Sequence, residues 1–109
     1  SMHIGLVGGL DRSEAQYRQL AERAGHTIEW HTGALAGRGA GTLESLVERA
    51  DLVIVVTAVN SHGAVWRARK LAKLRHKRLL LLARCGVSKF GSVLDELSTP
   101  GAAWKRVGG

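Results

Sequence analysis

The run Leu52-Val53-Ile54-Val55-Val56-Thr57 is the stretch of sequence that decides the fold. No polar residue interrupts it before Thr57, and most of its side chains are β-branched, a type enriched in strands. A strand that is apolar at every position has to be covered on both faces, which is typical of a parallel sheet between two layers of helices. We therefore expect residues 52–57 to be the most buried strand of an α/β fold.

Apolar runs alternate with amphipathic segments on either side of this strand, and the alternation predicts repeated βαβ units. The expected strands are residues 3–8, 26–31, 52–57 and 78–83, and the expected helices are residues 13–24, 43–50, 62–76 and 88–98. Right-handed crossovers then give a small three-layer αβα sandwich of the flavodoxin or Rossmann type, with a four-stranded parallel sheet in the order 2-1-3-4. Residues 1–98 would form this single domain, and 99–109 a C-terminal tail.

Local signals place several helix boundaries. Ser13, followed three residues later by Gln16, matches a capping box for the first helix. Residues 32–41 are so rich in glycine that we expect a mobile loop there, and Thr42 is the expected cap of the next helix.

Charge and cysteine content narrow the classes of function. The 109 residues carry 16 Lys and Arg against 9 Asp and Glu, a formal net charge of +7, and no acidic residue lies between Asp51 and Asp95. This localised excess predicts an anionic partner. No apolar run is long enough to cross a membrane. The single cysteine, Cys85, cannot form an internal disulfide, and no signal peptide is evident, so we expect a cytoplasmic protein.

Ligands of open parallel sheets bind at the carboxyl ends of the strands, near the point where the strand order reverses. We call this edge of the sheet the rim. In this sequence the residues expected there are Gly9 and Arg12 after the first strand, His31 after the second, and Ser61 and His62 after the third. The Gly8-Gly9 pair and the following helix start could let backbone amides approach a phosphate, although a plain turn is the simpler explanation of the glycines.

The helix expected at 62–76, with Asn60 and Ser61 as candidate caps, is the most informative segment. At 100° per residue one side is apolar and would face the sheet. That side comprises Ala64, Ala68, Leu71, Ala72 and Leu74. The opposite side gathers His62, Trp66, Arg69 and Lys73, with Lys70 at its edge. An indole on a solvated face suggests burial by a ligand, by a partner chain or by the C-terminal tail, unless it only packs on neighbouring aliphatic stems.

Histidine is the residue type here that could ligate a metal or haem iron. His31 and His62 are the candidates, because the fold would bring both to the rim. The remaining histidines, His3, His26 and His76, lie at element ends, where a structural role is expected. Cys85 is interpreted as a packing residue.

The sequence resembles the bacterial family known as domain of unknown function 2325. The resemblance spans residues 3–97, and its most specific part is Asn60-Ser61-His62 followed by Lys70 in the basic helix. The motifs that carry it also include Val7-Gly8-Gly9, Trp30-His31-Thr32-Gly33 and Ala50-Asp51-Leu52-Val53-Ile54. The resemblance implies a Rossmann-like sandwich, no established enzymatic activity, and haem as a ligand to consider.

Our leading hypothesis is a non-enzymatic, homodimeric module that binds haem and thereby a gas such as O2. His62 or His31 would ligate the iron, Trp66 or Trp30 would contact the macrocycle, and Arg69, Lys70 or Arg12 would pair with the propionates. Two alternatives stay open: a phosphate- or nucleotide-binding module, and non-specific nucleic-acid binding through the basic helix 62–78. An enzyme is disfavoured, because no paired carboxylates or triad occur at persuasive spacing.

Overall fold

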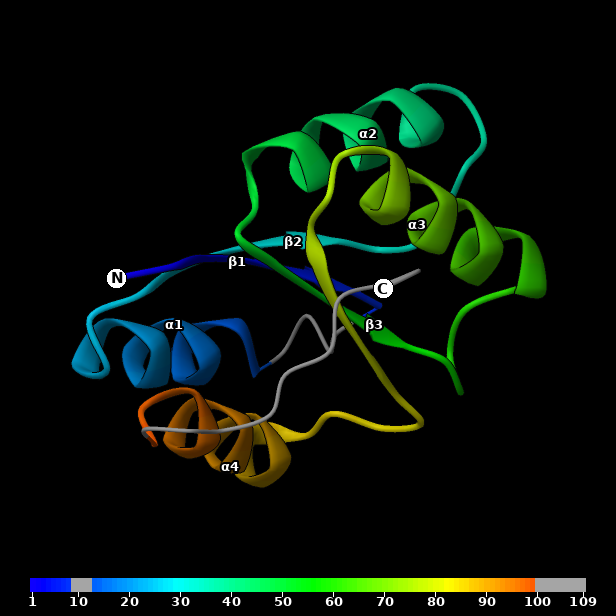
Figure 1. Ribbon diagram of the computed structural model, residues 1–109. Helices are drawn as coiled ribbons and strands as arrows, with labels where there is room; N and C mark the ends of the chain where they lie inside the picture. Colours follow the sequence, from blue (N-terminus) through cyan, green and yellow to red (C-terminus); the bar gives the residue numbers. More distant parts are fainter. Residues whose placement is uncertain (9–12, 100–109) are drawn as a thin grey trace.

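A computed structural model describes residues 1–8 and 13–99 of the chain, and Figure 1 shows its arrangement. Strands and helices alternate along the whole of it. The strands are β1 (His3–Val7), β2 (Thr27–His31), β3 (Leu52–Val56) and β4 (Arg78–Leu82), and the helices are α1 (Glu14–Arg23), α2 (Gly39–Arg49), α3 (His62–Leu74) and α4 (Val87–Leu97). The predicted α/β class and the order of the elements are therefore confirmed.

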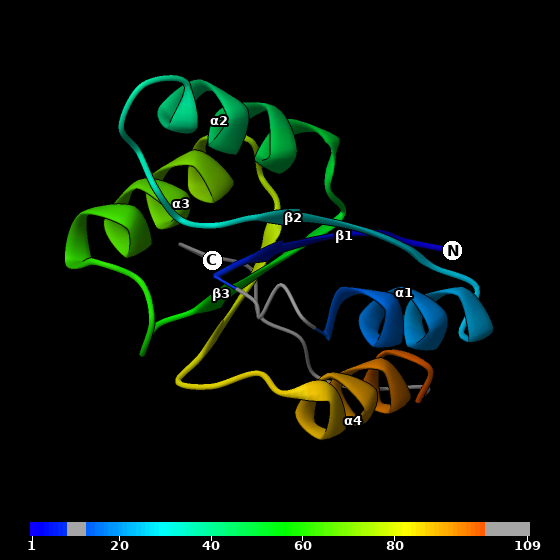
Figure 2. The ribbon, with the colours of Figure 1, turned by 180° about the vertical axis from the view of Figure 1, so that it is seen from behind.

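The four strands form one parallel sheet in the order β2-β1-β3-β4, as predicted. Helices α2 and α3 pack side by side on one face, and α1 and α4 pack on the other, which gives three layers (Figures 1 and 2). The strand order reverses between β1 and β3, whose register pairs Leu6 with Ile54. The carboxyl ends of these two strands mark the place where a ligand is expected in such folds.

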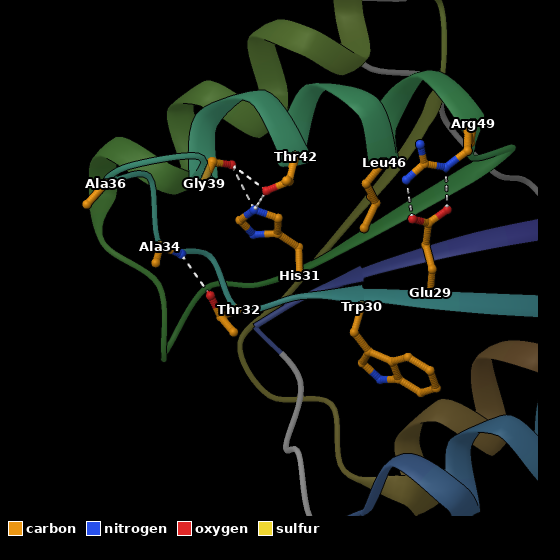
Figure 3. Close-up of a pocket in the computed structure, with 10 residues that line it drawn as sticks. All are labelled: Glu29, Trp30, His31, Thr32, Ala34, Ala36, Gly39, Thr42, Leu46 and Arg49. Atoms are coloured by element: carbon orange, nitrogen blue, oxygen red, sulfur yellow. Dashed lines mark hydrogen bonds and ion pairs between the residues drawn. The ribbon is translucent and has the colours of Figure 1, made fainter.

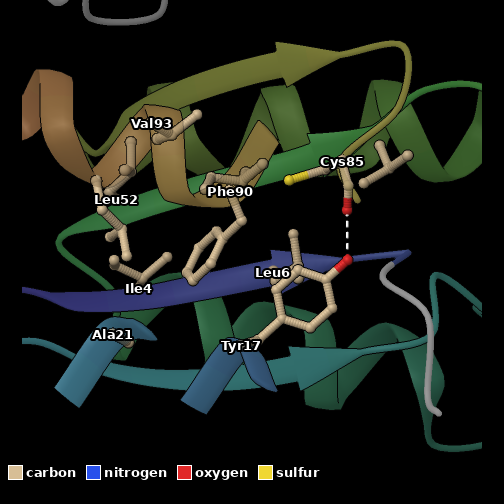
Figure 4. Close-up of a cluster of buried hydrophobic side chains, with 11 residues drawn as sticks. Ile4, Leu6, Tyr17, Ala21, Leu52, Cys85, Phe90 and Val93 are labelled. Carbon is tan, nitrogen blue, oxygen red and sulfur yellow. Dashed lines mark hydrogen bonds between the residues drawn. The ribbon is translucent and has the colours of Figure 1, made fainter. Parts of the chain in front are cut away.

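Every residue of β3 is buried, as expected for a strand covered on both faces. Alternate residues feed the two halves of the core, with Ile54 facing α1 and α4 and Val53 facing α2 and α3. On the α1 and α4 side, the rings of Tyr17 and Phe90 meet edge to face at 5.2 Å, and the Tyr17 hydroxyl donates a 2.5 Å hydrogen bond to the carbonyl of Cys85 (Figure 4). This bond ties α1 to the segment that joins β4 to α4.

Helix α2 begins earlier than predicted, because Gly39, Ala40 and Gly41 belong to its first turn. The expectation of a mobile loop through residue 41 is therefore wrong, as is the cap assigned to Thr42. Thr42 is a residue of the helix itself, and its hydroxyl donates to the carbonyl of Gly39 at 3.0 Å. The imidazole of His31 also binds that carbonyl. Glycine destabilises a helix because it loses more conformational entropy than other residues, and this contact from β2 offsets part of that cost.

Two further expectations about the helices need correction. Ser13 precedes α1, but its side chain makes no capping hydrogen bond within the described residues. Leu74 is 68% exposed, whereas Ala64, Ala68 and Leu71 are buried as predicted. The reason is that Leu74 is the last residue of α3 and lies at the margin of the apolar side of the helix. No described helix is both long and apolar enough to span a bilayer.

Candidate functional site

Asn60 joins the two central strands at the point where the strand order reverses. Its side-chain Nδ2 donates to the carbonyl of Val56 at 2.7 Å and to that of Val7 at 3.2 Å, so a single amide closes the ends of β3 and β1. Gly8 and Gly33 lie against it, both with positive φ (+89° and +95°), and a Cβ at either position would collide with the Asn60 side chain. The sequence predicts Asn60 as a candidate cap and as part of the Asn60-Ser61-His62 motif, but it does not predict these two hydrogen bonds.

Ser61 is the true cap of α3, because its hydroxyl accepts a hydrogen bond of 3.1 Å from the backbone N–H of Ala64. This fixes the helix start immediately after Asn60 and sets the direction in which the first turn presents its side chains. No acidic residue lies in that first turn, so the positive end of the helix dipole is not compensated there.

A hollow of about 720 Å³ lies beside the start of α3, at the carboxyl end of β3. Polar and apolar groups share its lining. The lining residues are Thr57, Ala58, Asn60, His62, Val65, Trp66 and Arg69. We call this hollow the α3 groove. It brings together three of the predicted site residues, namely His62, Trp66 and Arg69, and adds residues of the β3–α3 connection.

The aromatic wall of the α3 groove is solvent-accessible. Trp66 is 61% exposed, as predicted from its position opposite the apolar side of the helix, and Val59 nearby is equally exposed. The Nζ of Lys70 lies 4.8 Å from the centre of the indole ring, a cation–π contact that ties this lysine to the groove wall. His62, one turn before Trp66, is exposed as well.

The basic surface is narrower than the sequence suggests, because α2 supplies acidic partners to part of it. Arg75 contacts Glu44 at 3.1 Å and Glu48 at 3.7 Å, and Arg67 lies 4.0 Å from Glu44. These ion pairs join the flanks of α2 and α3. The cations of α3 that have no acidic partner among the described residues are Arg69, which lines the groove, Lys70, which contacts Trp66, and Lys73.

His31 lies in a second hollow, of about 400 Å³, between β2 and α2 (Figure 3). Both of its ring nitrogens have partners in the protein. Nδ1 accepts from the N–H of Gly33 at 2.9 Å, and Nε2 lies 2.8 Å from the Gly39 carbonyl and 2.9 Å from the Thr42 hydroxyl. The donor to Nδ1 requires a neutral ring with its proton on Nε2. His31 therefore organises the turn before α2, and it does not share a hollow with His62.

The side chains of Trp30 and His31 point to opposite faces of the sheet, since neighbours in a strand alternate (Figure 3). Trp30 packs against the core on the α1 and α4 side, with the guanidinium of Arg18 5.2 Å from its ring centre. The structure thus separates Trp30 from both Trp66 and His62. Gly9 and Arg12, the other predicted site residues, lie outside the described residues.

Cys85 lies near the same rim but within the core. It is 5% exposed, and burial raises the pKa of its thiol, with a smaller opposing effect from Lys89. Burial also raises the pKa of Tyr17, whose hydroxyl binds the Cys85 carbonyl. A raised pKa disfavours the nucleophilic thiolate, which agrees with the packing role predicted for Cys85.

These features define a small Rossmann-like α/β domain with an aromatic and basic groove at the carboxyl end of its sheet. The chain belongs to the DUF2325 family, described as an uncharacterized protein conserved in bacteria, whose model matches residues 3–97. The predicted family resemblance is therefore confirmed.

Curated relatives are UPF0751 proteins of Desulfitobacterium hafniense. One, from strain DSM 10664 / DCB-2, is 33% identical over 88 residues, which cover 80% of this chain and 86% of the relative. Another, from strain Y51, is 22% identical over 95 residues, covering 87% of this chain and 93% of its own length. No solved structure matches the chain.

Proposed function

We propose that this protein is a non-enzymatic module that binds a planar anionic cofactor in the α3 groove, with haem as the specific candidate. The observation that carries the proposal is the convergence of His62, Trp66 and Arg69 on one hollow at the carboxyl end of β3. An imidazole can ligate iron, an exposed indole can contact a planar ring, and a guanidinium can pair with a carboxylate, so the three groups together suit such a ligand.

The donor set fits haem with one protein ligand to the iron. His62 would hold the iron, Trp66 would contact the macrocycle, and Arg69 with Lys70 would pair with the propionates. Bound haem would supply an iron that can take a gas such as O2 as a further ligand. His31 is left out of the ligand set because its hydrogen bonds to Gly33 and Gly39 use both ring nitrogens.

A second candidate is a ligand that carries a phosphate group. The start of α3 favours it, because no acidic residue in the first turn neutralises the positive end of the helix dipole. Arg69, which lines the same groove, would add a positive charge. A nucleotide could place its phosphate at the helix start and its base on Trp66. Nucleic-acid binding ranks third, since the pairs of Arg67 and Arg75 with Glu44 reduce the free basic surface. Since Cys85 is the only cysteine, we keep the reducing cytoplasm as the proposed compartment.

The test is a titration of the protein with haem, followed by absorbance in the Soret region. We expect a shifted Soret band that His62→Ala abolishes, whereas His76→Ala, which removes a histidine outside the groove, leaves it unchanged. Trp66→Ala and Arg69→Ala should each weaken binding. If His62→Ala binds haem with an unaltered spectrum, the ligation proposal fails. If haem does not bind but nucleotides raise the melting temperature of the protein, the second candidate replaces it.

A further inference from the structure

Strand β4 forms one edge of the sheet, and its sequence Arg78-Leu79-Leu80-Leu81-Leu82 is nearly all apolar. Natural edge strands are usually protected by charged residues, proline or bulges, because their free backbone groups invite another strand. Strand β2, the opposite edge, has such protection: Glu29 in its centre is paired with Arg49. β4 has no charge beyond its first residue, and Leu81 is 39% exposed.

The hydrogen bonding shows which backbone groups of β4 face outward. The carbonyl of Leu82 accepts from the N–H of Thr57 at 2.7 Å, so Leu82 directs its backbone toward β3. Since this direction alternates along a strand, Leu80 and Arg78 also face β3, while Leu79 and Leu81 face outward. Within residues 1–8 and 13–99, the outward N–H and C=O groups of these two leucines have no strand partner.

We propose that β4 pairs in an antiparallel manner with β4 of a second copy of this chain, around a twofold axis at Leu80. In this register Leu79 of one copy exchanges two hydrogen bonds with Leu81 of the other, and the symmetric pair makes two more. Leu80 lies opposite itself, and Arg78 lies opposite Leu82, so no like charges face each other across the ladder. The pattern of β4 is thus complementary to itself, which is the requirement for a twofold interface.

The helices support the same arrangement. Helix α2 contacts β2 and β1, and α3 contacts β3 and β4, so the two neighbouring helices are separated by about two strand spacings, or ~10 Å. Extending the sheet across the axis places the two copies of α3 at the same separation of ~10 Å, which is within the range for packed helices. The sheet would become eight strands wide, and the α3 helices would cover Leu81 of both copies.

This dimer would also border each α3 groove with the α3 helix of the second copy. The interface itself does not depend on any ligand, so its test is separate from that of the proposed cofactor. Because each α3 carries Arg69, Lys70 and Lys73, we expect the two copies to repel at low ionic strength and to associate more strongly as salt screens these charges.

Light scattering coupled to size-exclusion chromatography tests the proposal on the unliganded protein, at low and at high salt. We expect a mass of about twice the 11.7 kDa of one chain. Leu81→Lys should give a monomer, whereas Leu74→Lys, which charges an exposed leucine away from β4, should leave the dimer intact. Circular dichroism would confirm that both variants are folded.

Cysteine cross-linking tests the register. Leu80→Cys would place two thiols on residues whose Cα atoms are ~4.5 Å apart, within the range that a disulfide bridges. Mild oxidation should cross-link this variant, but not Leu74→Cys or the wild type, whose Cys85 is buried. A wild-type protein that is monomeric at both salt concentrations would overturn the proposal. So would a dimer that persists in Leu81→Lys and does not cross-link in Leu80→Cys.

Discussion

The Nε2 of His31 lies 2.8 Å from the carbonyl oxygen of Gly39, the first residue of α2. Through this contact the last residue of β2 holds the start of a helix whose first turn contains two glycines. The ring also accepts a hydrogen bond from Gly33, so one imidazole organises both ends of the β2–α2 connection.

His31→Ala is therefore expected to loosen the start of α2. The loss of the bonds to Gly39 and Gly33 should lower the free energy of unfolding by about 1 to 2 kcal/mol. Hydrogen exchange would show faster exchange of the amides in residues 39–43, with the rest of α2 less affected. His62→Ala is the matched control and should leave these amides unchanged. Equal protection in His31→Ala and the wild type would contradict the assigned role.

Asn60 and Gly33 should be energetically coupled. Asn60→Ala removes both hydrogen bonds to the strand ends and is expected to destabilise the protein by about 1 to 3 kcal/mol. Gly33→Ala is expected to destabilise it too, through the collision with Asn60 and through its positive φ. In the double variant the two hydrogen bonds are still lost and the backbone strain at position 33 remains, but the collision is absent. The combined loss, measured by urea unfolding, should therefore be smaller than the sum of the single losses.

The Glu29 carboxylate is expected to contribute to the loss of stability of the protein at acidic pH. Its hydrogen bond with Arg49 is the main cause of a lowered pKa, and a further contact with His3 acts in the same direction, while burial opposes both. Because the folded state holds this carboxyl in its charged form, its stabilising effect is complete above the unfolded pKa and is lost as the pH falls through the folded one.

Glu29→Gln should consequently show a shallower loss of melting temperature than the wild type as the pH falls below about 4.5, the ordinary glutamate value. At neutral pH the variant should be the less stable of the two. Glu22→Gln, a change of the same kind on α1, serves as the control and should follow the wild-type curve. Parallel curves for Glu29→Gln and the wild type would show that this carboxyl is not responsible.

Cys85 should react slowly with thiol reagents in the folded protein. Burial both restricts access and raises the pKa of the thiol, so few thiolates are available at neutral pH. We expect the rate of modification by a disulfide reagent to rise steeply on denaturation. Leu74→Cys provides an exposed thiol in the same chain as a reference, and modification of Cys85 at a comparable rate in native buffer would contradict its placement.

Much of the fold could be predicted because it depends on local patterns. The apolar run of β3 and the spacing of Ala64, Ala68 and Leu71 on α3 indicate both the elements and the faces that they bury. The same spacing placed Trp66 on the exposed side of the helix. The start of α2 could not be found in this way, because the contact that supports Gly39 comes from His31 on another element.

The candidate site was predicted only in part, for the same reason. His62, Trp66 and Arg69 share the α3 groove because they lie on one helix, where spacing alone relates them. Trp30 and His31 are adjacent in sequence, yet the alternation of a strand sends their side chains to opposite faces. The role of Asn60 depends on Gly8 and Gly33, which are both distant in sequence. The usable signal was an Asn shortly after a central strand, together with glycines that follow the neighbouring strands.

The crowding of Gly8 and Gly33 around Asn60 has a consequence for how the family diverges. Positions 8, 33 and 60 cannot drift independently, since a side chain at either glycine position needs the space that the amide fills. A family member with a larger residue at position 8 or 33 should have a shorter residue at position 60, and would then have to close the ends of β1 and β3 by other means. Aligned family sequences could thus be sorted into two groups by these three columns alone, and we expect the path of the chain into α3 to differ between the groups.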